Sequence, residues 1–170
     1  QYPACPGYMT LFPTVMTPRP TPSPTTPSPT CQILSDTNIK TVVTDWLGGN
    51  PGCHGHISTW DVSNVTTMSH MFIAAGSFNQ NISLWNVSNV TSMQAMFVSA
   101  NAFAQNISTW DVSNVISMNH MFEGNSGFNQ DISTWDVSNV SGMHKMFLGA
   151  SSFNQNIGSW NTQNVTDMGY

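Results

Sequence analysis

Three acidic side chains recur at a spacing that could support acid–base chemistry. Asp61, Asp111 and Asp136 are separated by multiples of 25 residues, and two carboxylates about 5–10 Å apart can hydrolyse a glycosidic bond. Asn86 interrupts the row, however, and no neighbouring residue distinguishes a general acid from a nucleophile. Ser-His-Asp, Cys-His, phosphate-loop and dinucleotide-binding motifs are also absent from the sequence. We therefore expect an exposed polar row that contacts Ca²⁺ or a partner, and a protein that is not an enzyme.

A second group of residues could bind a metal ion. Cys53 is followed closely by His54 and His56, and Cys and His are the usual protein ligands of Zn²⁺. No second pair of ligands with zinc-site spacing follows in the sequence. The sequence therefore predicts no metal site and no cofactor.

These residues must be positioned by a repeat that dominates the chain. Tryptophan recurs every 25 residues, and isoleucine, methionine and phenylalanine recur in registers of their own. The tryptophans are Trp60, Trp85, Trp110, Trp135 and Trp160. A constant period of this length is typical of stacked copies of one structural unit, which form a solenoid.

The pattern within one repeat predicts two elements. Trp60 and Val62 alternate around Asp61, which favours a short strand. Helical spacing then links the apolar residues Val65, Met68, Met71, Phe72 and Ala75. We expect an α/β solenoid: a leucine-rich-repeat-like stack of 25-residue turns, each made of a strand, a short helix and a return loop, with parallel pairing between successive strands.

The remaining segments divide the chain into four parts. Residues 1–16 form an apolar N-terminal arm, which either docks on an apolar surface or is a leader without fixed structure. Residues 17–30 are a Pro/Thr/Ser-rich spacer that favours polyproline II. Residues 31–56 hold an N-terminal cap, with an amphipathic helix predicted over 35–47 and its start at Ser35 or Asp36. The repeat occupies residues 57–170 as four full turns and a partial fifth.

Composition and charge exclude several partners. Charged residues make up only 6% of the chain against 39% hydrophobic residues, and the net charge is −5. So few cations exclude nucleic acid as a partner, and no apolar run reaches the roughly 18 residues of a membrane helix. The chain starts at Gln1 rather than Met, which indicates a mature terminus after signal-peptide removal and hence a secreted, extracellular or cell-surface protein.

The three cysteines predict one disulfide and one remaining thiol. Cys31 and Cys53 flank the predicted helix, so a bond between them would staple it to the repeat. The alternative pairs Cys5 with Cys31 and closes the Pro-rich segment. In the first arrangement Cys5 is free or bonded to another molecule.

The repeat resembles a known family. The string GHISTWDVSNVTTMSHMF at 55–72, followed by FNQNIS, is similar to the 25-residue form of the BspA-like surface-protein repeat. The resemblance covers residues 55–170, with departures at Asn86, Asn161, Thr162 and Gln163. It implies a secreted or cell-surface protein used in adhesion or matrix contact, without catalysis and without a shared active site.

Several side chains are candidates for glycans, which would compensate for the low charge. Seven N-x-S/T sequons occur. We expect glycans at Asn81, Asn86 and Asn106 first, and at Asn64, Asn89, Asn139 and Asn164 second. The O-linked candidates are Thr17, Thr21, Ser23, Thr25, Thr26 and Ser28.

The last copy of the repeat stops partway through its turn, at Tyr170. Either the native chain continues, or a second copy covers the apolar end, and a head-to-tail contact of that kind builds a homo-polymer. The candidate assembly residues lie in the arm and in the last turn: Tyr8, Leu11, Phe12, Trp160, Met168 and Tyr170. We expect a secreted, glycosylated structural protein that forms an extracellular fibre. The alternatives are a cell-surface adhesin that binds a protein or glycan on its strand face, and a glycosidase acting through the aspartate row.

Overall fold

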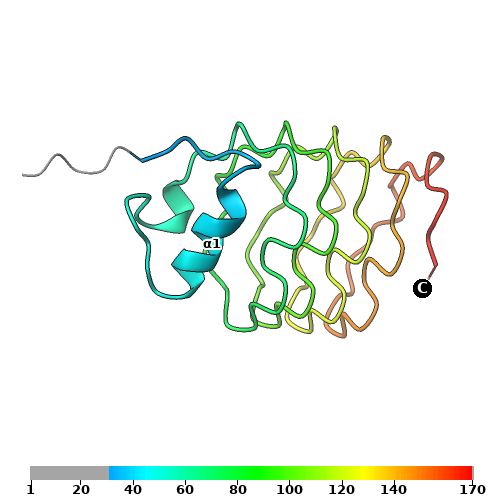
Figure 1. Ribbon diagram of the computed structural model, residues 1–170. Helices are drawn as coiled ribbons and strands as arrows, with labels where there is room; N and C mark the ends of the chain where they lie inside the picture. Colours follow the sequence, from blue (N-terminus) through cyan, green and yellow to red (C-terminus); the bar gives the residue numbers. More distant parts are fainter. Residues whose placement is uncertain (1–30, 170) are drawn as a thin grey trace, which may run out of the picture.

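A computed structural model describes residues 31–169 as a stack of 25-residue turns closed at one end by a helix. The helix α1 spans Ile39–Leu47, and a 3-10 helix, η1, spans Ile57–Thr59 at the entry to the first turn. Figure 1 shows α1 against the N-terminal end of the stack, with the successive turns following it in chain order. No helix among the described residues is long and apolar enough to cross a membrane.

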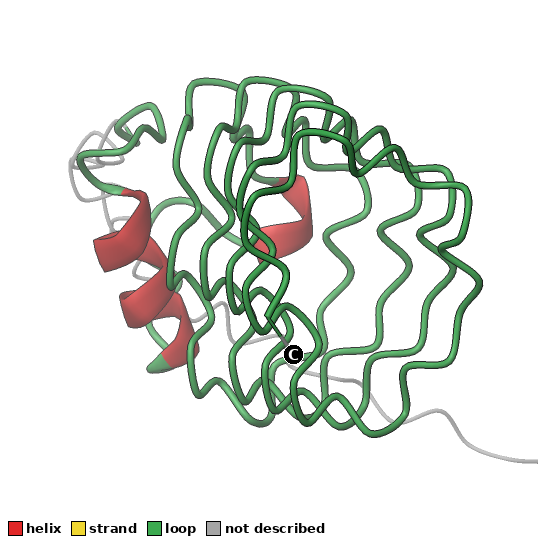
Figure 2. Ribbon diagram, turned by 90° about the vertical axis from the view of Figure 1, so that its right-hand side faces the viewer, coloured by secondary structure: helices red, strands yellow, loops and turns green. Residues whose placement is uncertain are grey.

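The predicted α/β solenoid of strand and short-helix turns is wrong. Within residues 31–169 the backbone of the repeats consists of tight turns and irregular segments, with no sheet and no repeat helix (Figure 2). Parallel pairing between turns is limited to isolated bridges in a single register, which join Thr67, Ser92, Ser117, Gly142 and Asp167 in succession. The segment around Trp60, predicted as a strand, is extended but pairs with no neighbouring strand.

Consecutive tight turns produce the apolar spacing that predicted a helix. Val65 N–H donates to the Val62 carbonyl at 2.9 Å, and Ala75 N–H donates to the Phe72 carbonyl at 3.1 Å. Each such turn advances the chain by three residues, so it repeats apolar side chains at nearly the helical interval. His70 separates these turns with a φ of 62°, a left-handed conformation that ends a right-handed helix.

A ladder of backbone hydrogen bonds runs from each turn to the next turn. N–H groups at every second residue from Met68 to Ala74 donate to carbonyls 24 residues later, as in His70 N–H to the Gln94 carbonyl at 2.9 Å. The same ladder repeats one turn later, with Phe97 N–H donating to the Met121 carbonyl at 2.9 Å. In this ladder the donors point towards the C-terminal end of the stack, whereas a separate bond at each turn points back, as in Thr91 N–H to the Thr66 carbonyl at 2.8 Å.

Columns of aromatic rings fill the space inside the turns. Phe97 stacks on Phe122 with ring centroids 5.7 Å apart, and Phe122 stacks on Phe128 of its own turn at 4.0 Å. Most of the repeated Trp, Met, Val and Ile side chains surround these columns and are buried in one continuous core. The repeated residue types therefore form a structural core.

The tryptophan column also carries a repeated hydrogen bond. The indole Nε1–H of Trp110 donates to the Ile82 carbonyl at 3.2 Å, and Trp85, Trp135 and Trp160 make the equivalent bond. The indole nitrogen of Trp60 is buried and has no hydrogen-bond partner among residues 31–169. The first turn thus keeps the tryptophan of the repeat but lacks the carbonyl that a preceding turn would provide.

Replacing these two tryptophans by phenylalanine should give different results. Trp110→Phe removes a buried hydrogen bond to the Ile82 carbonyl, which keeps the Trp85 N–H as its other donor. We expect it to lower the free energy of unfolding by about 0.5–1.5 kcal/mol more than Trp60→Phe. Both changes remove the same ring atoms from buried positions, so the difference isolates the hydrogen bond. Urea unfolding of the two variants measures it, and equal losses would contradict the assignment.

Candidate functional site

The last described turn carries an apolar hollow of about 710 Å³. It is lined by Met143, Met146, Phe147, Leu148, Gly149, Ile157, Gly158, Trp160, Thr162 and Met168, which we call the end face. Met168 is 55% exposed, whereas Met118 and Met143, in the same register, are buried. The end face therefore has the shape and chemistry with which each turn receives the next one.

Backbone donors lie at the same end of the stack. Met143 N–H donates to the Asp167 carbonyl and Lys145 N–H to the Gly169 carbonyl, both at 2.9 Å. Phe147 and Gly149 continue this row of donors, and no carbonyl among residues 31–169 accepts from them.

The predicted assembly residues fall partly on this face. Trp160 is half-buried and Met168 is exposed, and both line the hollow. The predicted arm residues Tyr8, Leu11 and Phe12, and also Tyr170, lie outside the described residues. Met143, Met146 and Leu148 also line the hollow and were not predicted as assembly residues. The methionine registers could have identified Met143 and Met146, whereas Leu148 shares its register with Glu123.

The N-terminal end of the stack is covered by α1. Ile39 and Val43 of the helix are buried, and Trp46 packs edge-on against Phe78 with centroids 6.3 Å apart. The helix begins four residues after the predicted start at Ser35, because the preceding residues form a turn in which Ser35 N–H donates to Asn38 Oδ1 at 2.9 Å. The helix ends at Leu47, before Gly48.

Asp36 joins this cap to the first turn. Its carboxylate accepts the N–H groups of Thr66 and Thr67 at 2.8 and 3.0 Å, together with the Thr66 hydroxyl. Burial raises the pKa of the Asp36 carboxyl, but the hydrogen bonds from Thr66 and Thr67 outweigh burial and lower the pKa below its usual value.

We expect the cap to weaken at acidic pH through Asp36. Because the pKa is lower in the folded chain, this carboxylate stabilises the fold above the unfolded pKa of about 4 and loses that effect as the pH falls through the folded value. Asp36→Asn should lower the free energy of unfolding at neutral pH by about 1 kcal/mol, a figure already reduced because Asp36 is exposed. It should also flatten the pH dependence of that free energy below about pH 5. Urea unfolding at several pH values measures both quantities, and an unchanged acid slope would argue against Asp36.

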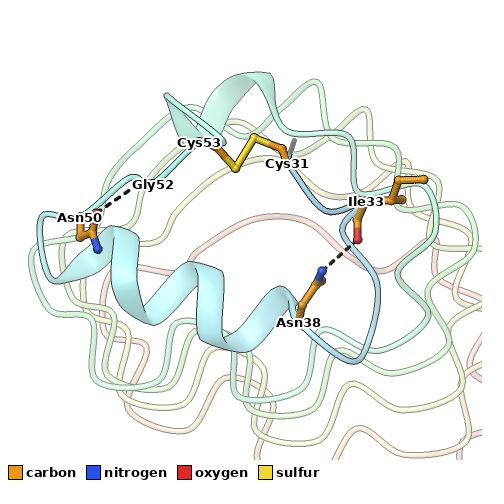
Figure 3. The surroundings of a disulfide bond; sticks show 6 residues. All are labelled: Cys31, Ile33, Asn38, Asn50, Gly52 and Cys53. Atoms are coloured by element: carbon orange, nitrogen blue, oxygen red, sulfur yellow. Dashed lines mark hydrogen bonds between the residues drawn. A yellow bond between two sulfur atoms is a disulfide. The ribbon is translucent and has the colours of Figure 1, made fainter. Parts of the chain in front are cut away.

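A disulfide between Cys31 and Cys53 fastens the cap from the other side (Figure 3). The two Cα atoms are 5.6 Å apart. Asn38 Nδ2 donates to the Ile33 carbonyl at 2.9 Å and so ties the segment after Cys31 to the start of α1. This is the pairing that the sequence analysis favoured, and Cys5 lies outside the described residues.

The two histidines near Cys53 have different surroundings. A ring nitrogen of His54 and the sulfur atoms of Cys31 and Cys53 all lie within 4.8 Å of one another. His56 instead accepts the Ser58 N–H at 3.3 Å and caps η1. His54 and His56 therefore do not share a site: a ring nitrogen of His54 lies close to both cysteine sulfurs, whereas His56 caps η1.

The aspartate row shapes the backbone. Asp61, Asp111 and Asp136 are exposed, and each carboxylate accepts the N–H of the serine two residues later, as in Ser63 N–H to Asp61 at 3.0 Å. Hydrogen bonds from the serines lower the pKa of both Asp61 and Asp136. Both pKa values are therefore shifted in the same direction, whereas a general acid paired with a nucleophile needs pKa values that are shifted apart.

The candidate glycan residues differ in how their amides are used. Asn81, Asn86 and Asn106 are exposed, and each accepts a serine N–H through Oδ1, which leaves Nδ2 outside these bonds. A second register uses Nδ2 to bond the preceding turn: Asn89, Asn114, Asn139 and Asn164 donate to the carbonyls of Ser63, Ser88, Ser113 and Ser138. Asn64 is exposed. The O-linked candidates Thr17, Thr21, Ser23, Thr25, Thr26 and Ser28 lie outside the described residues.

The chain matches the model of one protein family. Residues 37–115 and 85–170 match the model of the family described as "Mycoplasma protein of unknown function, DUF285". The two matched ranges together span the cap helix and all the repeats. No curated protein and no solved structure matches the chain.

Proposed function

We propose, for a chain that belongs to the DUF285 family, that it is a secreted, non-enzymatic structural protein that assembles head to tail through the ends of its stack. The end face carries this proposal. It exposes an apolar hollow of about 710 Å³, and most of its lining residues occupy registers that are buried elsewhere in the repeat. In this proposal the end face packs against the N-terminal end of a second copy, at the edge of the first turn where Ile73 is 49% exposed beside the α1 cap.

The two ends of the stack are complementary in hydrogen bonding. Phe147 and Gly149 present donors at the C-terminal end, as described above. The carbonyls of Ser69, Met71 and Ile73 lie at the N-terminal end in registers that accept in every later turn, and no backbone N–H among residues 31–169 donates to them. A donor row facing an acceptor row supports a heterologous contact, which propagates into a filament when its rotation does not close.

The surface favours an extracellular setting for this assembly. With only 6% charged residues, solubility must come from amides, hydroxyls and attached carbohydrate. We propose N-linked glycans at Asn81, Asn86 and Asn106, whose side chains are exposed and whose Nδ2 atoms are not used between turns. The BspA-like resemblance of the repeat supports the same surface location.

A shallow groove favours a second candidate function. It has a volume of about 570 Å³ and is lined by Asn89, Thr91, Asn114, Ile116 and Asn139, which come from successive turns. Ile116 is 52% exposed there. This surface would suit an adhesin that binds an extended peptide or glycan along the stack.

Assembly of the 170-residue chain separates the two functions. We expect filaments by negative-stain microscopy and a concentration-dependent increase in sedimentation. Met168→Asp combined with Leu148→Asp should abolish both, because these exposed side chains line the end face. Leu84→Asp is the matched control, since Leu84 is 87% exposed and lies outside the end face.

Circular dichroism must show that all three chains remain folded for this comparison to count. Uniform monomers of the unaltered chain would overturn the fibre and favour the adhesin. Filaments that persist in the double variant would show that assembly does not use the end face.

A further inference from the structure

We propose that Cys31, Cys53 and His54 form a Zn²⁺ site when the disulfide is reduced. The three ligand atoms already lie within 4.8 Å of one another in the oxidised chain. They come from two segments, one on each side of α1, that converge beside the first turn (Figure 3).

The spacing suits a tetrahedral metal ion. Zn–S bonds of about 2.3 Å and Zn–N bonds of about 2.0–2.1 Å put neighbouring ligand atoms roughly 3.3–3.8 Å apart. Once the bond between the sulfurs is broken, small side-chain rotations can bring all three atoms to these separations, because the Cα atoms of the cysteines are only 5.6 Å apart. A hollow of about 270 Å³, lined by both cysteines and His54, leaves room for a water molecule as the fourth ligand.

The site is accessible to both a reductant and a metal ion. Cys53 is exposed, and Cys31 and His54 are at least partly exposed. A dithiol gives two electrons and two protons to the S–S bond, which becomes two thiols while the dithiol closes its own disulfide. Zn²⁺ then binds both sulfurs as thiolates and releases the two protons, and neutral His54 binds through a ring nitrogen.

Metal binding would preserve the cap in a reducing medium. The disulfide holds residues 31–34 against the first turn, where Leu34 is buried beside the core. A metal ion bound to the same two sulfurs would hold the same segments together, and His54 would add a third attachment. In the proposed site the bound metal ion therefore replaces the disulfide as the link between the two segments.

Co²⁺ provides the spectroscopic test, because thiolate coordination gives it intense charge-transfer bands. We would use the full chain with Cys5→Ser, so that the third thiol takes no part, and reduce it with a phosphine, which leaves two thiols and a phosphine oxide. The reduced chain should bind one Co²⁺ with tetrahedral d–d bands, and Zn²⁺ should displace it. The oxidised chain should show neither signal.

His54→Ala should weaken Co²⁺ binding at least about tenfold, because it removes a ligand. His70→Ala is the matched control, since His70 is an exposed histidine outside the cluster, and it should bind as tightly as the parent. Circular dichroism checks that each reduced chain is folded. Absence of the thiolate bands in a folded reduced chain, or equal affinity of the His54→Ala variant, would overturn the proposal.

Discussion

Phe122→Ala is expected to lower the free energy of unfolding by about 3–5 kcal/mol, the usual cost of removing a fully buried phenylalanine. Phe122 is 0% exposed. Its ring stacks on Phe128 at 4.0 Å, on Phe97 at 5.7 Å and on Phe147 at 5.7 Å. Alanine would therefore open a cavity that contacts three successive turns at once, and the rigid backbone ladder would limit how far they could collapse into it.

Urea unfolding followed by tryptophan fluorescence measures this loss. Leu84→Ala is the matched control, because Leu84 is 87% exposed, and we expect a change within about 0.5 kcal/mol for it. A similar loss in both variants would contradict the assignment of Phe122 to a continuous core. A Phe122→Ala loss below about 1 kcal/mol would show instead that neighbouring turns refill the space.

The core was predictable because the repeat encodes it directly. Trp110 and Phe122 differ in type and size, but each recurs at 25 residues with the same type in the other turns. A side chain that recurs in this way must have equivalent surroundings in every turn, and for large apolar residues the equivalent surroundings are buried. The structure places both inside the stack.

The backbone conformation could not be predicted in the same way. Tight turns advance by three residues, so Val65, Met68 and Phe72 follow nearly the same interval that an amphipathic helix would give. The residues that exclude a helix cannot be recognised by their type, because His70 and Ala95 adopt φ values of 62° and 54° without being glycine. Hydrogen bonds to the next turn stabilise this strained conformation.

The two candidate sites differ in how far the sequence predicts them. The end face follows in part from register, since Met168 is the next copy of Met143, but only Trp160 and Met168 of its lining were predicted from the sequence. The position of His54 depends on how the loop after α1 returns to Cys31. That path is set by contacts of the cap with the first turn, and the spacing of Cys53 and His54 in the sequence does not encode it.

Replacing both Cys31 and Cys53 by serine is expected to destabilise the cap by about 3 kcal/mol. The disulfide joins residues separated by 22 positions, and closing a loop of this length restricts the unfolded chain by about that amount on the chain-entropy model. The loss should be local, because the bond fastens residues 31–34 and α1 while the later turns are held by their own ladder. Amide hydrogen exchange measures it: the α1 amides should exchange about 100-fold faster, with little change in the turn that contains Phe122.

Cys5→Ser is the matched control for this experiment, because it removes the third cysteine and leaves the bond between Cys31 and Cys53 intact. It should exchange like the unaltered chain, and a reductant without metal should bring its α1 exchange to the level of the double variant. Accelerated exchange in Cys5→Ser alone would instead favour a bond between Cys5 and Cys31. Unchanged α1 exchange in the double variant would mean that Leu34, Asp36 and the buried face of α1 hold the cap without a covalent link.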